Sequence, residues 1–321
     1  MRVVIGVLTL LFAFASAVAE ESVRFSFAAL GCMPYGEESW PGFERAIGEI
    51  NRHAPAFSVH CGDTKRSVDP PSDAHLERLH AAFGTFAGPL IYTPGDNEWT
   101  DVHREAAGGH DPLVWLGKLR EKFFPLDQSL GGTPLPLIRQ SADRRFASYV
   151  ENARWSRGGV TFATVHVVGS NNGNLPNVPG AVAEFQARNA ANIVWIQEVF
   201  AGARKAEAKG LALFFHGDIF AEDFGRAHAD SGHSEFIAAL EAEALAFTRP
   251  VLLVHSDEHR YRLEKDVRLE RDRPRLPNVT RLETFGAVNL HAVLVTVDPR
   301  SAEVFLAGPL LVPGNALPVL P

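Results

Sequence analysis

Four short apolar segments of the chain each run directly into a group of polar residues that can bind a metal ion. The segments are Ala56 to His60, Leu90 to Thr93, Leu211 to Phe215 and Val251 to Val254, and the polar groups are residues 60–63, 95–98, 216–218 and 255–259. Continuous apolar runs of this length are typical of parallel strands that are buried on both faces. Because α/β sheets bind ligands beyond the carboxyl ends of such strands, we expect the four polar groups to converge in space.

Segments with helical periodicity alternate with these strands and predict an α/β fold. The remaining elements are predicted as a first strand at residues 23–30, helices at 41–51, 72–86, 182–208 and 235–246 with another beginning at Asp111-Pro112, antiparallel strands at 145–150 and 159–168 around Gly158-Gly159, a solvated loop or hairpin at 260–275, and strands at 290–297 and 303–306. No repeat or linker interrupts this pattern. Residues 20–321 are therefore expected to form a single domain.

The first 19 residues have the layout of a secretory signal peptide. Met1-Arg2 is followed by an apolar run from Val3 to Phe14 and by the small-x-small sequence Ala17-Val18-Ala19. The run is too short for a stable membrane span, and no second segment is long enough for one, so no stable membrane insertion of the mature chain is expected. We expect an exported protein, periplasmic or secreted, with an uncleaved membrane anchor as the alternative.

The net charge limits the kinds of partner that the protein can bind, and the cysteine count limits the disulfides that it can form. The formal net charge of -7 weighs against nucleic acid as the main partner, which would require a basic face. Two cysteines, Cys32 and Cys61, are too few for a disulfide scaffold but can still pair in an oxidising compartment. Nothing in the sequence indicates an oligomeric state.

The polar groups supply the ligands that a site for divalent cations requires. The candidate metal ligands are Asp63, Asp96, His216, Asp257 and His259. Two-metal sites hold their ions about 3.5–4 Å apart, usually with one bridging carboxylate. Imidazole and carboxylate together suit zinc, iron or manganese better than calcium. Each position also has a structural alternative, since an Asp after Gly fits a turn and a strand-end His fits a packed core.

In the order and spacing of these motifs, the chain resembles the calcineurin-like metallophosphoesterases. That family carries Asp-x-His, Gly-Asp, Gly-Asn-His-Asp/Glu, a lone His and Gly-His-x-His. The matching segments are Gly31 to Tyr35, Gly62-Asp63, Gly95 to Glu98, His216 and Ser256 to His259. The resemblance covers residues 23–307 and implies an αββα sandwich, in which two central β-sheets are flanked by helices.

The resemblance also implies a role for each matching residue. Asp63 falls on the carboxylate that bridges the two ions, and Asp96 and His216 fall on ligands of the second ion. Asp257 and His259 fall on the two histidines of the last motif. Glu98, which closes the third motif, is expected to act as support.

The chain departs from the family pattern at the first metal position. Cys32 and Pro34 stand in place of the Asp and His of the first motif, and Asn97 replaces the His that contacts phosphate. An Asn side chain can donate a hydrogen bond to phosphate but cannot deliver a proton near neutral pH. Cys32 can be a thiolate ligand, which favours zinc, a disulfide partner of Cys61, or an inert thiol.

The sequence therefore predicts an exported phosphoesterase that hydrolyses a small phosphorylated substrate with metal-activated water. One or two divalent ions (zinc, manganese or iron) are expected as cofactors. Asn97 and His259 are the expected catalytic residues, and Asn97 and Lys65 are expected to contact the substrate. The alternative is a catalytically degenerate protein of the same fold that binds a ligand or a metal. A weaker alternative is a cell-envelope interaction protein without metal.

Overall fold

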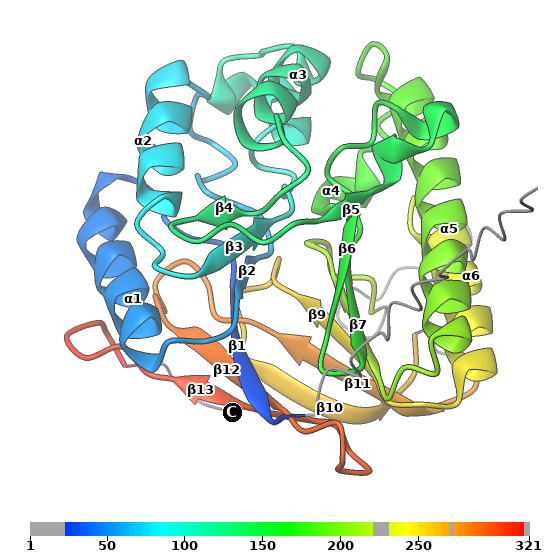
Figure 1. Ribbon diagram of the computed structural model, residues 1–321. Coiled ribbons are helices and arrows are strands. Elements are labelled where there is room, and N and C mark those ends of the chain that lie inside the picture. The colour runs from blue at the N-terminus through cyan, green and yellow to red at the C-terminus, as the bar shows by residue number, and fades with distance from the viewer. Residues whose placement is uncertain (1–22, 221–230, 270–272, 318–321) are drawn as a thin grey trace, which may run out of the picture.

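Two β-sheets pack face to face in the computed structural model, which describes residues 23–220, 231–269 and 273–317 (Figure 1). The first sheet has the strand order β13 (Phe305–Leu310), β12 (Ala292–Val297), β1 (Phe25–Leu30), β2 (Ser58–His60), β3 (Pro89–Tyr92) and β4 (Leu130–Gly131). Strands β1, β2 and β3 are parallel, because the helices α1 (Trp40–His53) and α2 (Asp73–Phe83) connect each to the next. Strand β12 pairs antiparallel with both β1 and β13.

The second sheet places four parallel strands side by side. Its order is β10 (Arg262–Val267), β11 (Leu276–Glu283), β9 (Val251–His255), β8 (Leu211–Phe214), β7 (Val160–Thr164), β6 (Ala153–Arg157) and β5 (Ile138–Arg139). Strands β7, β8, β9 and β11 are parallel, and helices α5 (Ala181–Lys205) and α6 (Ser234–Phe247) connect the first three. Strands β8 and β9 are buried along their whole length, as their continuous apolar sequences predict.

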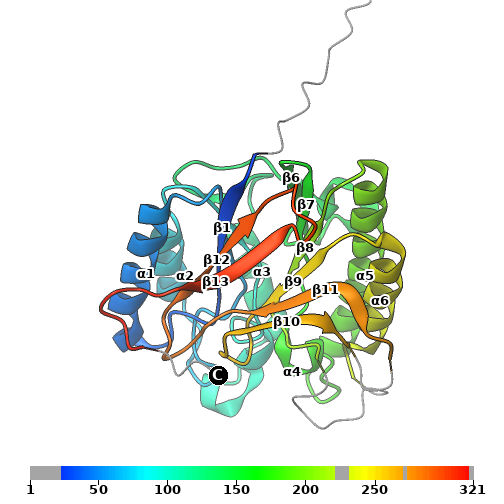
Figure 2. The ribbon, with the colours of Figure 1, turned by 90° about the horizontal axis from the view of Figure 1, so that it is seen from below.

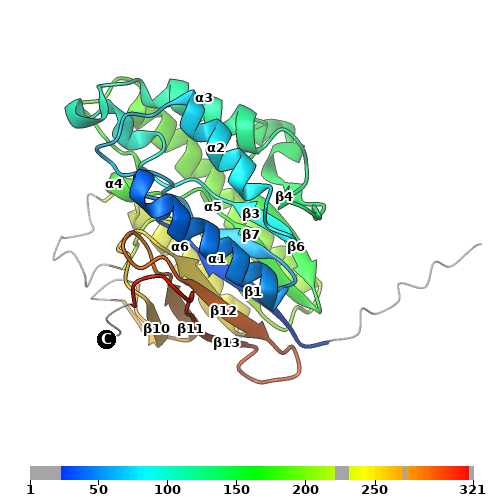
Figure 3. The same cartoon turned by 90° about the vertical axis from the view of Figure 1, so that its left-hand side faces the viewer.

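Helices cover the outer faces of the two sheets. Helices α1 and α2 lie on one side of the molecule and α5 and α6 on the other (Figure 2), and Figure 3 places α1 and α2 in front of the first sheet. The elements that remain are α3 (Pro112–Phe123), the short α4 (Gly169–Asn172), and 3₁₀ helices at Glu37–Ser39, Thr100–His103, Glu105–Ala107, Gln140–Ala142 and Arg144–Phe146. The predicted αββα sandwich is therefore confirmed. No helix of the described residues is long and apolar enough to span a bilayer.

Aromatic side chains fill the space between the two sheets. Phe27 of β1 stacks on Phe57 with ring centroids 5.1 Å apart. Phe162 and Phe214 from the second sheet meet Phe27 edge-on at 5.9 and 5.5 Å. Burying one such ring contributes about 1.5–3 kcal/mol. This core fixes the two sheets against each other, and with them the strand ends that carry the polar groups.

Two predictions about the secondary structure differ from the structure. The strand predicted at residues 145–150 is wrong, because a 3₁₀ helix begins this segment and the strand that pairs with β7 is β6. Polar residues obscure strand β6 in the sequence, since only Ala153 and Trp155 of its five residues are buried in the core. The segment 260–275 contains one strand of the hairpin alternative, β10, but its partner β11 was not predicted. Pro277, Asn278 and Arg281 interrupt the apolar pattern of β11.

A buried polar network supports the end of β7, which leads to the polar groups. Glu151 is fully buried and pairs with Arg120 at 2.6 Å and with His166 Nδ1 at 3.3 Å. The main chain of His166 is held on both sides, because its N–H donates to Asn152 Oδ1 and its carbonyl accepts from Arg188. Although burial opposes the charge of Glu151, the His166 imidazole, when protonated, and the Arg120 guanidinium lower the pKa of Glu151 to about 2.

Replacing Glu151 by Gln should lower the free energy of unfolding by about 1.5–3 kcal/mol at pH 7, because a hydrogen bond to a charged group is lost inside the protein. The folded-state pKa of about 2 lies below the ordinary value of 4.5. The contribution of the carboxylate is therefore complete above pH 4.5 and is lost as the pH falls through 2. Urea unfolding of both proteins across this range should show the difference shrinking, whereas exposed Glu303→Gln should have no effect. A difference that stays constant down to pH 2 would contradict the assignment.

Candidate metal centre

Four of the five predicted ligands lie at the carboxyl ends of four parallel strands, two from each sheet. Asp63 and Asp96 follow β2 and β3, and His216 and Asp257 follow β8 and β9. The Nε2 atom of His216 lies 2.8 Å from Asp96 Oδ1 and 3.5 Å from both Asp63 Oδ1 and Asp257 Oδ1. The imidazole is fully buried, and Asp257 is the most open of the carboxylates at 20% side-chain exposure. The structure thus brings together three carboxylates around one imidazole.

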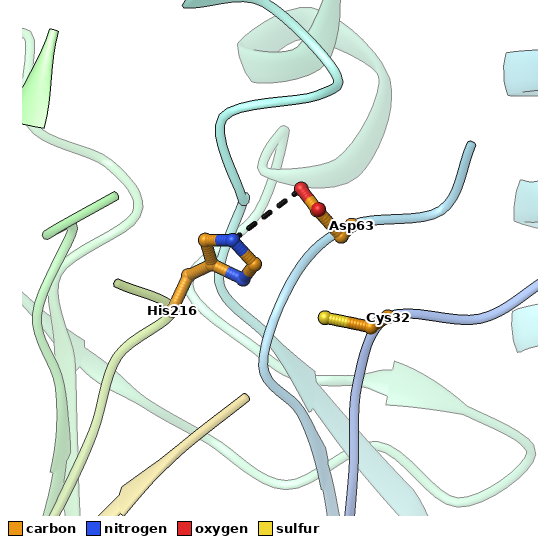
Figure 4. Close-up of side chains that lie close together, drawn as sticks. All are labelled: Cys32, Asp63 and His216. Atoms are coloured by element: carbon orange, nitrogen blue, oxygen red, sulfur yellow. Dashed lines mark ion pairs between the residues drawn. The ribbon is translucent and has the colours of Figure 1, made fainter. Parts of the chain in front are cut away.

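Cys32, at the end of β1, faces the same space. Its sulfur and one ligand atom each of Asp63 and His216 lie within 4.8 Å of one another (Figure 4). Cys61 instead packs into the core between the sheets, and burial raises the pKa of its thiol to about 12. Both cysteines are free thiols, so the structure does not form the disulfide that the sequence left open as one of three alternatives. The strand ends are neighbours, but the two side chains enter different environments.

The backbone turns sharply where these strands end. Cys32, Asp63, Asp257 and His259 all have left-handed conformations, with φ of 51°, 59°, 53° and 63°. Residues other than glycine rarely adopt this region, at a cost of about 1–3 kcal/mol each. The turns also require small neighbours, because a Cβ atom on Gly95 would lie only 2.6 Å from the nitrogen of Asp63. These turns place Cys32, Asp63 and Asp257 beside His216, and His259 beside Tyr35.

The cluster carries an excess of negative charge. Burial raises the pKa of Asp63 well above its ordinary value, and the Asp96 and Glu98 carboxylates add to the rise. Although burial opposes its charge as well, Asp63 and Asp257 raise the pKa of His216 well above its ordinary value. A hydrogen bond from His216 in turn holds the pKa of Asp96 below its ordinary value, against the effect of burial. One imidazolium compensates only part of the charge of three carboxylates, which favours an additional cation.

The spacing of the donor atoms fits a single divalent cation. Zinc binds nitrogen and carboxylate oxygen at about 2.0–2.2 Å, which places two ligands of one ion roughly 3.0–3.5 Å apart. The distances from His216 Nε2 to Asp63 Oδ1 and to Asp257 Oδ1, both 3.5 Å, agree with this spacing, and the 2.8 Å contact with Asp96 Oδ1 is a hydrogen bond. The donor set of imidazole and carboxylates also suits zinc, manganese and iron. Asp96, His216 and Asp257 therefore fit one such ion, and Asp63 Oδ1 lies beside them, 3.5 Å from His216 Nε2.

Comparison with known proteins identifies the fold. No protein-family model and no curated protein matches the chain. A dimetal phosphatase from Danio rerio aligns with a TM-score of 0.53 and 9% identity over 88% of this chain and 98% of its own. A purple acid phosphatase from yellow lupin (Lupinus luteus) aligns with a TM-score of 0.52 and 10% identity over 91% of this chain and 55% of its own. GAP50, the anchor in the inner membrane complex of Plasmodium, aligns with a TM-score of 0.51 and 11% identity over 91% and 90%.

The chain has the calcineurin-like metallophosphoesterase fold. The cluster around His216 contains Asp96 and His216, the two residues that the sequence resemblance assigns to the second metal ion. Glu98 supports it as expected, since its carboxylate accepts from Thr64, Tyr92 and the nitrogen of Gly95.

The first metal position of the metallophosphoesterase fold has a different structure here. The hydroxyl of Tyr35 donates to Asp63 Oδ2 at 2.6 Å, accepts from Asn97 Nδ2 at 3.0 Å, and lies 3.3 Å from His259 Nε2. Burial raises the pKa of this phenol well above its ordinary value and lowers the pKa of His259. Thus His259, the fifth predicted ligand, lies beside Tyr35 and outside the cluster around His216. In the sequence, Tyr35 is the last residue of the segment that matches the first family motif.

Two predicted substrate contacts differ from the structure. Lys65 is buried, and its Nζ donates to the carbonyls of Arg66 and Asp69 within its own loop, so this prediction is not met. The Asn97 Nδ2 group donates to Tyr35 and to the carbonyl of Lys65, so both amide hydrogens are used within the protein. The main-chain N–H of Asn97 also donates to Asp63 Oδ1. Asn97 therefore orients Asp63 here, and its side chain can contact phosphate only by giving up one of these bonds.

A chain of hydrogen bonds links the cluster to an arginine that the sequence did not single out. The hydroxyl of Ser170 donates to Asp96 Oδ2 or to Asp101 Oδ1, each at 2.7 Å. Arg104 donates to the Ser170 hydroxyl at 3.0 Å and pairs with Asp101 at 2.9 Å. Burial and the charge of Asp96 raise the pKa of Asp101 to about 7.

A cavity of about 850 Å³ opens above these residues. Its wall includes Asp63, Asp96, Asp257 and His259 of the predicted site, and further Tyr35, Asn97, Asp101, Ser170, Arg66, Arg104, Asp218 and His233. The volume lies in the range of pockets that bind small molecules. Arg66 and Arg104 also line the cavity, and their guanidinium groups pair with Asp69 and Asp101.

Proposed function

We propose that the protein is a metal-dependent phosphoesterase that acts on a small phosphorylated substrate. The observation that carries the proposal is the cluster of Asp63, Asp96 and Asp257 around His216 in the wall of the cavity. The fold supports it, since proteins with the same fold include phosphatases from Danio rerio and yellow lupin.

Different residues of the chain would bind the metal ion, orient its ligands and bind the phosphate in such a reaction. Asp96, His216 and Asp257, with Asp63 beside them, would hold a divalent cation, which would supply Lewis-acid activation of a phosphoryl oxygen and of a water molecule. Asp63 is oriented by the main-chain N–H of Asn97 and by the Tyr35 hydroxyl, which both donate to its carboxylate. Arg104 is 42% exposed and lies next to Ser170, so it can pair with a phosphate oxygen at the open side of the cluster. Arg66 lines the same cavity and adds a second positive charge.

A direct test uses the purified protein that begins near Glu20. Bound metal is measured by elemental analysis, and hydrolysis of an aryl phosphate is followed after loading with manganese, zinc or iron. Turnover that requires the added metal would support the proposal. Bound metal without turnover on aryl, alkyl or diester phosphates would instead support the degenerate binding module. That alternative is favoured by the loss of family ligands at Cys32 and Pro34. Absence of metal binding under every loading condition would exclude both.

Replacing Arg104 by Ala should lower kcat/KM by roughly 10- to 100-fold. A hydrogen bond to a charged group contributes about 1.5–3 kcal/mol, and each factor of ten in rate corresponds to about 1.36 kcal/mol. Arg104→Lys should recover only part of the loss, because lysine lacks the planar fork that binds two phosphate oxygens. Arg300→Ala, a surface variant, is the matched control. Unchanged kcat/KM in Arg104→Ala would show that another group binds the phosphate.

We also propose that the protein is exported, from the sequence of its first 19 residues alone. These residues lie outside the part of the chain that the structure describes. Amino-terminal sequencing of protein recovered outside the cytoplasm should begin near Glu20. A protein that stays in the cytoplasm with an intact amino terminus would contradict export.

A further inference from the structure

We infer that the Tyr35 phenol occupies the first metal position of the fold, so that the protein binds one divalent ion instead of two. The inference rests on the metal site of the proposed function and adds the number of ions that it holds. It is carried by three contacts of one oxygen atom, those from Tyr35 to Asp63, Asn97 and His259.

The contacts of the Tyr35 oxygen are hydrogen bonds and do not have the spacing of metal ligands. Its distance of 2.6 Å to Asp63 Oδ2 is that of an O–H donor and a carboxylate, about 2.5–2.7 Å. Two ligands of one ion at about 2.1 Å lie roughly 3.0 Å or more apart. Asn97 meets the same oxygen through Nδ2, an amide nitrogen that donates and does not bind cations. An ion at this position would have to break the bond from Tyr35 to Asp63.

The residues that would attract a first ion are also reduced in number. Pro34 offers no donor atom, and Cys32 shares its space with Asp63 and His216. His259 is in edge contact with the Tyr35 ring, with centroids 5.3 Å apart. Cys32, Asp63 and His259 therefore remain as possible ligands of a first ion, and Asp63 and His259 are both engaged with the phenol.

Tyr35 acts as a positioning residue for the ion that remains. Its hydroxyl holds Asp63 Oδ2 while the nitrogen of Asn97 holds Oδ1 at 3.0 Å. Such outer contacts fix the direction of a metal-binding carboxylate, and removing one typically weakens metal binding about 10- to 100-fold. The Tyr35 hydroxyl thus replaces one ion and orients a ligand of the other.

The test measures the number of bound ions by native mass spectrometry of the mature chain after loading with excess Mn²⁺ or Zn²⁺. One equivalent is expected, and titration with Co²⁺ should give a single break at one equivalent in the visible spectrum. Tyr35→Phe should keep one equivalent with at least tenfold weaker affinity, whereas Tyr149→Phe, a control at another tyrosine, should change neither quantity. Cys32→Asp/Tyr35→Ala removes the phenol and restores a family carboxylate, so it should bind a second equivalent.

Two equivalents in the wild-type protein would overturn the inference, and so would a Cys32→Asp/Tyr35→Ala variant that still binds only one. Because Tyr35→Phe changes a single atom, it tests the positioning role even if the double variant does not fold. Failure of this inference can be distinguished from failure of the proposed function. One ion without turnover contradicts the phosphoesterase proposal alone, and two ions with turnover contradict the inference alone.

Discussion

Asp63→Asn should reduce hydrolysis of a phosphate ester by at least roughly 10³-fold, because a bound cation contributes several kcal/mol of transition-state stabilisation and each factor of ten corresponds to about 1.36 kcal/mol. Asp63 is the carboxylate that contacts both His216 and Tyr35. Its Oδ1 lies 3.5 Å from His216 Nε2, and its Oδ2 accepts from Tyr35. An amide at this position offers one neutral oxygen and turns its NH₂ group toward one of these partners. Metal content should therefore fall well below one equivalent.

Loss of activity in Asp63→Asn should not come from unfolding. The metal-free cluster holds three carboxylates within reach of one imidazole, and removing one of them relieves like-charge repulsion. The melting temperature of the metal-free variant should be no lower than that of the wild type. Asp73→Asn on the surface of α2 is the matched control and should keep full metal content and activity. A variant at Asp63 that retained metal and turnover would remove this residue from the site.

The sequence predicts most of the fold because the relevant signal is local. The strands before Asp96 and His216 are short apolar runs, which are typical of strands buried on both faces, whereas Val59 is the apolar residue of the strand before Asp63. Strands β6 and β11 lack that signal, because charged and polar residues interrupt their apolar sequences. Their existence depends on neighbouring strands that lie far away in the sequence, so tertiary contacts decide them.

The candidate site is predicted less completely than the fold. A strand end determines where a residue lies, and this was enough to bring Asp63, Asp96, His216 and Asp257 into one region. It does not determine where a side chain points, which is why Lys65 turns back into its own loop. Side-chain direction also separates Cys32 from Cys61.

Residues that reach the site from loops are the hardest to predict. Tyr35 and Arg104 belong to no strand end, and each acts through partners that are distant in the sequence. Tyr35 meets His259, 224 residues away, and Arg104 meets Ser170, 66 residues away. A single sequence carries no signal for such pairs. The departure from the family pattern was more informative here than the match. Cys32 and Pro34 stand where the family has metal ligands, and Tyr35 lies next to them in the sequence.

Gly62→Ala should produce the largest loss of stability expected at the site, about 2–5 kcal/mol. Gly62 has φ of 81°, a left-handed conformation that costs an L-residue about 1–2 kcal/mol. A Cβ atom there would lie 2.7 Å from Gly95 Cα and 2.7 Å from the carbonyl carbon of Pro94, and closer still to the Gly95 nitrogen. These are main-chain atoms that cannot rotate away, and overpacking of this kind costs about 1–3 kcal/mol. The turns after β2 and β3 must therefore separate.

Separation of these turns should also be visible in the metal site, because Gly62 precedes Asp63 and Gly95 precedes Asp96. Chemical denaturation measures the stability, and metal titration of the folded fraction measures the affinity, which we expect to fall together with it. The matched control is Gly48→Ala in the middle of α1, where an added Cβ meets nothing within 4 Å. That variant should gain about 0.5–1 kcal/mol, because alanine favours a helix over glycine. If Gly62→Ala were as stable as the wild type and bound metal equally well, the close contact of the two turns could not be what holds Asp63 and Asp96 together.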